Sequence, residues 1–151
     1  MANDRIIEGL QLIVTNLSQQ ALGHKIQAKV FAGQGFSKLA DKYAEHYDEE
    51  MSYVDRCIDR ILDLGGIVEN QAKPAHPVHT DPVEWVKHDL QVSIDGLAAL
   101  KQIIDGAKDD LTTYDLLKDY YKDEEEDLYW GQAQLDLIER IGVQNWLVHQ
   151  L

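Results

Sequence analysis

Apolar residues recur at intervals of three and four positions along most of this chain, and no alternating apolar–polar run of useful strand length occurs. This periodicity predicts long helices over residues 3–31, 36–64, 81–105 and 112–142. Gly33-Gln34-Gly35 follows the first helix and Gly65-Gly66 the second, as is typical of helix ends. Asp81 and Pro82 form a helix start, and a short fifth helix is predicted over 143–151.

The connection between the second and third helices is unusually long. Residues 67–80 hold two of the three prolines and show no periodicity, so the segment is long enough to cross the whole bundle. Two helices, a long crossover, two more helices and a short fifth form the topology of the ferritin-like four-helix bundle. We therefore predict an all-α fold and a single ferritin-like domain over residues 1–151.

Charge and composition narrow the range of functions. The chain has 151 residues, with 14 Lys and Arg against 27 Asp and Glu, and its formal charge of -13 disfavours nucleic-acid partners. The single cysteine, Cys57, suits a reducing compartment. No signal-peptide pattern and no apolar run of about 18 residues occurs, so we expect a cytoplasmic protein without a membrane partner.

Several polar residues interrupt the apolar faces at one level of the predicted bundle: Gln20, His24, Glu50, Tyr53, Ser93, Glu124 and Asp127. A buried carboxylate without a partner costs several kcal/mol, so three together need an explanation. They could share protons, enclose water, pair with a protonated His24, or hold a metal ion. The candidate metal ligands are Glu50, Glu124, Asp127, His24 and Tyr53.

Two of these residues lie in an acidic run. Over residues 123–127, helical spacing directs only Glu124 and Asp127 inward and predicts that Asp123 points outward with its other neighbours. Three roles remain open for Tyr53: a metal ligand, a radical site, or a residue whose hydroxyl bonds to Glu124.

Longer stretches resemble the bacterioferritin family. The strongest runs over residues 123–130 and 134–147, and a second covers 48–51 and 55–64. Asp89-Leu90 and Asp95-Gly96 resemble the third helix of that family. The resemblance implies a subunit of a hollow iron-storage shell that forms dimers and then a closed homo-oligomer.

The resemblance also implies where iron would bind. That family has six ligand positions, and this chain keeps glutamate at two of them, Glu50 and Glu124, which bridge the irons in that family. The other four positions are changed and hold Leu17, Tyr53, Ser93 and Asp127. This pattern indicates a degraded or rearranged ferroxidase site. The chain is then a ferroxidase, oxidising Fe(II) with oxygen, only if the altered site binds iron.

Met51 is the second feature that the resemblance singles out. A methionine at this position ligates haem b between two bacterioferritin subunits, so Met51 is a candidate cofactor ligand. Two alternatives to a rearranged iron-storage subunit follow. One is a haem-binding protein without ferroxidase activity, and the other is a non-catalytic structural subunit in a mixed shell with a catalytic ferritin subunit.

Overall fold

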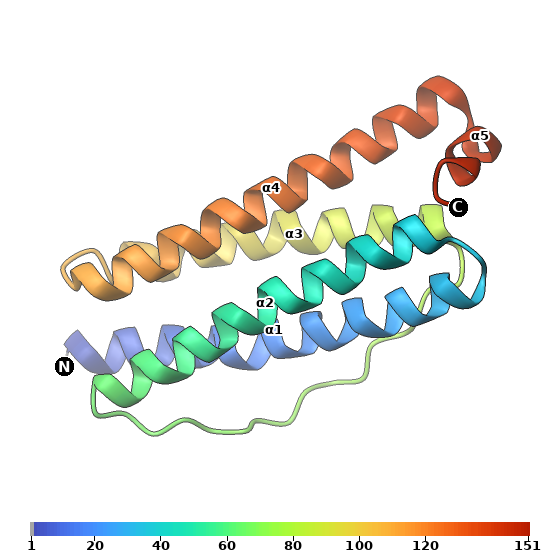
Figure 1. Cartoon of the computed structure of the whole chain (residues 1–151). Helices are drawn as coiled ribbons and strands as arrows, with labels where there is room; N and C mark the ends of the chain where they lie inside the picture. The colour runs from blue at the N-terminus through green and yellow to red at the C-terminus, as the bar shows by residue number, and fades with distance from the viewer. Residues whose placement is uncertain (1) are drawn as a thin grey trace.

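The computed structural model describes residues 2–151 and confirms the ferritin-like four-helix architecture (Figure 1). Its helices are α1 (Ala2–Gly33), α2 (Ser37–Asp63), α3 (Pro82–Asp105), α4 (Leu111–Ile141) and α5 (Val143–Val148). Each helix end lies within three residues of its predicted position. No helix in this part of the chain is long and apolar enough to cross a lipid bilayer.

The bundle is built from two antiparallel hairpins, α1 with α2 and α3 with α4 (Figure 1). Glycines with positive φ allow the chain to leave two of these helices, Gly35 after α1 at +89° and Gly65 after α2 at +79°. The predicted start of α3 is confirmed, because the Asp81 carboxylate accepts a hydrogen bond from the Val83 amide at 2.9 Å.

The crossover predicted over residues 67–80 occupies residues 64–81 and runs back along the bundle beside α1 (Figure 1). Two glutamines of α1 hold the crossover through hydrogen bonds to its backbone. Gln11 donates to the Glu69 carbonyl at 3.0 Å and accepts from the Glu69 amide at 2.9 Å. Gln27 makes the same pair of bonds with His79, both at 2.8 Å. The loop backbone therefore finds partners although it has no secondary structure of its own.

Two apolar clusters fill the bundle, one in each half. The first includes Leu10, Leu17, Cys57, Ile61 and Leu117. The second, beside α5, includes Phe31, Leu39, Tyr43, Trp85 and Trp146. The residues of α1 and α2 between these clusters include Gln20, His24, His46 and Glu50, and this interval is where the buried polar groups gather.

Candidate metal centre

The buried polar groups form two layers, and each long helix supplies one residue to each layer. The amide–carboxylate layer consists of Gln20, Glu50, Ser93 and Glu124. The histidine layer consists of His24, His46, Asp89 and Asp127. On every helix the two members are three or four positions apart, which is one helical turn. The histidine layer is therefore one turn nearer the end of the bundle that carries α5.

In the amide–carboxylate layer, one amide group serves two carboxylates. Gln20 Nε2 donates to Glu50 Oε2 at 2.8 Å and, more weakly, to Glu124 Oε1 at 3.4 Å. Both carboxyl groups are buried, with exposed fractions of 2% for Glu50 and 4% for Glu124. Burial, followed by the charges of Glu50 and Asp89, raises the pKa of Glu124 to about 7. Glu124 therefore holds a proton well above the usual range of a glutamate.

His24 joins the two layers. Its Nδ1 hydrogen-bonds to Glu50, and its Nε2 lies 2.7 Å from Asp89 Oδ1. Burial lowers the pKa of His24, but the charges of Asp89 and Glu50 outweigh burial and raise this pKa well above its usual value. His24 is consequently an imidazolium that donates to two carboxylates from different helices.

His46 has the opposite electrostatic surroundings. Its exposed fraction is 2%, and neither ring nitrogen has a hydrogen-bond partner among the described residues. Burial and the charge of His24 lower the pKa of His46 to about 3, so its ring is neutral. Asp127 Oδ1 lies 3.4 Å from His46 Nε2, and burial with the charge of Glu124 raises the pKa of Asp127 to about 8. His46 is thus a buried, neutral imidazole with an unprotonated ring nitrogen that can accept a hydrogen bond or a metal ion.

Aromatic rings cover the histidine layer on the side of α5. Trp85 lies edge-on to His24 with ring centres 5.8 Å apart, and Trp130 lies edge-on to His46 at the same separation. Tyr43 packs between them, 5.6 Å from Trp85 and 5.8 Å from Trp130. These rings limit the access of water from that end, which strengthens electrostatic interactions within the layer.

The structure brings four of the five candidate metal ligands together. Glu50 and Glu124 belong to the amide–carboxylate layer, and His24 and Asp127 to the histidine layer. Tyr53 does not join them, because its hydroxyl donates to Asp123 and its ring packs on Tyr120 with centres 5.2 Å apart. The metal-binding role of all five residues stays a prediction.

The structure differs from one of the three roles left open for Tyr53 and from the prediction that Asp123 points outward. The Tyr53 hydroxyl bonds to Asp123 rather than to Glu124, and Asp123 is half-buried rather than directed into solvent. The physical reason is the length of the tyrosine side chain. Its hydroxyl extends to the position before Glu124 on α4, where the Asp123 carboxylate accepts its hydrogen bond.

Sequence reasoning did not include His46 and Asp89 among the candidate ligands, although a signal was present. His46 precedes Glu50 by four positions, and Asp89 precedes Ser93 by four. The same step, taken along α1 from Gln20, leads to His24. The step runs backward along the chain on α2 and α3 and forward on α1. Because α1 is antiparallel to α2 and α3 (Figure 1), all three steps lead toward the end of the bundle that carries α5.

The residues present do not fit the two-iron arrangement that the bacterioferritin resemblance implies. Leu17 is only 2% exposed and belongs to the first apolar cluster, so it offers no ligand. Tyr53 is engaged by Asp123, and the Gln20 amide bonds to both remaining glutamates, Glu50 and Glu124. The centre has therefore lost ligands that a two-iron arrangement needs.

The surroundings of Met51 fit a haem poorly. Met51 is half-buried and packs against the first apolar cluster. At positions where the family resemblance leads us to expect apolar contacts with a porphyrin, Lys25 lies over the ring of Tyr47, 4.8 Å from its centre, and Ser18 accepts a hydrogen bond from Lys73. Haem ligation by Met51 stays a prediction.

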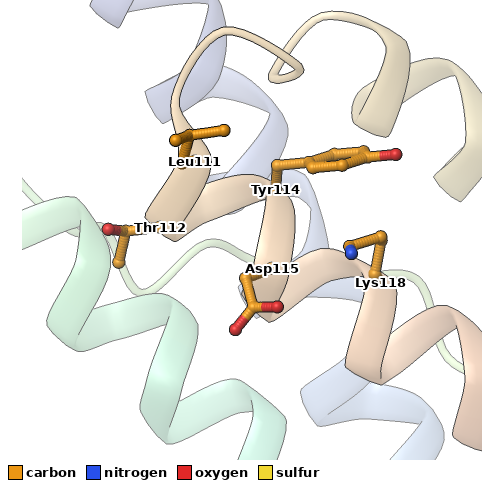
Figure 2. Close-up of a pocket in the computed structure, with 5 residues that line it drawn as sticks. All are labelled: Leu111, Thr112, Tyr114, Asp115 and Lys118. Carbon is orange, nitrogen blue, oxygen red and sulfur yellow. The ribbon is translucent and has the colours of Figure 1, made fainter.

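An open surface hollow of about 480 Å³ lies at the start of α4, lined by Leu111, Thr112, Tyr114, Asp115 and Lys118 (Figure 2). Lys118 covers the ring of Tyr114, 4.8 Å from its centre. The hollow has one carboxylate, Asp115, and its lining residues end six positions before Glu124. It is therefore a surface feature that is separate from the polar centre.

Comparisons with known proteins agree with this architecture. Residues 7–141 match the ferritin-like domain family. The chain is 32% identical to a bacterial ferritin of Pseudomonas aeruginosa over 149 residues, covering 97% of this chain and 96% of that protein. A bacterial ferritin of Neisseria meningitidis serogroup B is 32% identical over 155 residues, covering 96% of this chain and all of that protein (100%). A bacterioferritin of Streptomyces coelicolor is 32% identical over 139 residues, covering 89% and 80%.

The chain belongs to the ferritin-like family, which confirms the resemblance found in its sequence.

Proposed function

We propose that this chain is a bacterioferritin-like subunit of an iron-storage shell in which the iron-oxidising centre is rearranged. The similarity to bacterial ferritins over nearly the whole chain carries this proposal. It extends through α4 and α5, so it is not limited to the residues around the polar centre. Iron is then the cargo of the assembled shell and not a resident cofactor of the isolated subunit.

Rapid oxidation of Fe(II) in pairs requires several oxygen and nitrogen ligands around two neighbouring ions. Leu17 removes one of these ligands, and the bonds of Gln20 to Glu50 and Glu124 compete with metal for the remaining glutamates. The rearranged centre therefore supports slow or no paired oxidation. A mixed shell with a catalytic ferritin subunit would supply the missing step.

Iron uptake by metal-free recombinant protein tests this function. We expect aerobic Fe(II) oxidation without a rapid phase, at the same rate as in a Glu50→Ala/Glu124→Ala double variant. We also expect a large particle that retains many more irons than it has subunits. Size-exclusion chromatography with light scattering gives the assembly, and iron analysis after desalting gives the load.

Two results would overturn the proposal. A rapid phase of about one or two irons per subunit that disappears in the double variant would identify a working ferroxidase. A particle no larger than a dimer, or one that retains no iron beyond the number of subunits, would remove the storage role.

Haem binding is the second candidate that follows from the family resemblance. Its support is the position of Met51 alone, and the polar side chains of Lys25 and Ser18, at positions where the family resemblance implies contacts with a porphyrin, speak against it. A Soret band after purification from a haem-replete host, lost in Met51→Leu, would establish haem ligation. If the assembled wild-type shell shows no Soret band, haem binding is ruled out.

A further inference from the structure

The histidine layer contains a ligand set that differs from the family positions. His24, His46 and Asp89 each offer one ligand atom, and these three atoms lie within 4.8 Å of one another. They come from α1, α2 and α3, which are rigid elements with few ways to rearrange. We propose that these three residues bind one divalent first-row transition-metal ion per subunit, one helical turn nearer α5 than Glu50 and Glu124.

His46 gives the independent reason to expect a ligand here. A buried polar atom normally has a hydrogen-bond partner, and an unpaired one costs about 1–3 kcal/mol. Both ring nitrogens of His46 are buried without a hydrogen-bond partner among the described residues, in a residue that is 2% exposed, and Asp127 Oδ1 lies 3.4 Å from Nε2. A metal ion bound to one of these nitrogens would satisfy it and would remove the cost of leaving it unpaired.

His24 is already oriented as a ligand. Its Nδ1 bonds to Glu50, while its Nε2 faces Asp89 at 2.7 Å. A ligating histidine typically donates its second ring N–H to a carboxylate, which fixes the tautomer and directs the other nitrogen at the metal. Glu50 is thus a positioning residue, and a metal ion would replace the proton between His24 Nε2 and Asp89.

The size of the site fits such an ion with a small closing movement. Nitrogen and oxygen ligands bind zinc tetrahedrally at about 2.0–2.2 Å, so two ligand atoms of one ion lie about 3.5 Å apart. The three atoms in this structure lie within 4.8 Å. A side-chain movement of about 1 Å at the ligand atoms closes the difference.

The donor set determines the class of ion. Two imidazoles and one carboxylate suit Fe(II), Co(II) and Zn(II), whereas Mg²⁺ and Ca²⁺ prefer oxygen ligands. The covering rings of Trp85 and Trp130 limit competing water. This site goes beyond the proposed storage function and does not depend on it, because its ligands all lie within one subunit.

Cobalt(II) titration of the metal-free full-length protein tests the site. We expect one tight site per subunit with visible absorption from imidazole-bound cobalt, displaced by one equivalent of Zn(II). His46→Gln and Asp89→Asn should each weaken this site at least ten-fold. Glu126→Gln, an exposed change on α4, should leave it unchanged and controls for ions held by the acidic surface.

A second variant separates the two layers. Glu124→Gln alters the amide–carboxylate layer without removing a ligand of the histidine layer, so the cobalt spectrum should persist in it. Equal binding by wild type and His46→Gln would overturn the proposal, as would loss of the spectrum in Glu124→Gln. X-ray absorption of the zinc-loaded wild-type protein gives an answer that needs no variant: two imidazole ligands support the site, and a shell of oxygen alone overturns it.

Discussion

Replacing Glu124 with glutamine is expected to stabilise the metal-free protein at neutral and alkaline pH, by on the order of 3 kcal/mol. In the folded chain the pKa of Glu124 is raised from its ordinary 4.5 to about 7, because the group is buried and close to Glu50 and Asp89. The unfolded chain gives up this proton more readily. Glutamine keeps the hydrogen-bonding shape and carries no charge to be buried.

The sign of the pH dependence follows from the raised pKa. Below about pH 4.5 the carboxyl is protonated in both states, so wild type and Glu124→Gln should be equally stable. As the pH rises from about 4.5 to about 7, the folded state holds more protons than the unfolded state, and wild type loses stability relative to the variant. Above this range the difference should be constant.

Denaturant unfolding in the presence of a chelator, at fixed protein concentration between pH 4 and 9, measures this difference. Glu126→Gln is the matched control, because its side chain is exposed on the same helix, two positions away. A pH-independent difference between wild type and Glu124→Gln would mean that the pKa of Glu124 is the same in the folded and unfolded states, which contradicts the prediction.

Trp146→Ala is expected to destabilise the protein by about 3–5 kcal/mol, the range for removing a large aromatic side chain from a core. Trp146 is the buried residue of α5, with an exposed fraction of 0%. Its Nε1 donates to Gln134 Oε1 at 2.9 Å, and its ring packs in the second apolar cluster with Phe31 and Leu39. Without this ring, α5 loses its anchor on the bundle.

Denaturant unfolding gives the stability change, and limited proteolysis near the C-terminus reports the release of α5. Trp146→Phe should cost less, since it retains most of the apolar contact and loses the hydrogen bond to Gln134. Val148→Ala is the control on the same helix, because Val148 is 64% exposed. A Trp146→Ala variant that unfolds within 1 kcal/mol of wild type would show that α5 contributes little to the bundle.

The fold could be predicted because its signals are local. Apolar spacing of three and four marks the helices, and Asp81 with Pro82 marks the start of α3 through bonds to its own first turn. The crossover could be predicted from its length alone. Its attachment to α1 could not, because Gln11 and Gln27 bond to residues more than 50 positions away and resemble ordinary surface glutamines in the sequence.

The candidate site was predictable in its location and only partly in its members. His24, Glu50, Glu124 and Asp127 are polar residues on apolar helix faces, so helical spacing alone brings them near one another. The division into two layers depends on the relative shift of neighbouring helices. A shift of one turn decides whether His46 faces Glu124 or Asp127, and side-chain packing between helices determines that shift.

The way the crossover is fastened has a consequence for the conditions under which it stays in place. Apart from Lys73, which donates to Ser18, its side-chain hydrogen bonds with α1 come from the neutral amides of Gln11, Gln19 and Gln27 and the hydroxyl of Thr15. None of these groups changes charge between acidic and alkaline pH, and bonds between neutral groups are little affected by dissolved ions. The buried centre of the bundle can therefore change its protonation while the amide and hydroxyl bonds that hold the crossover on α1 stay the same, in dilute buffer and in concentrated salt alike.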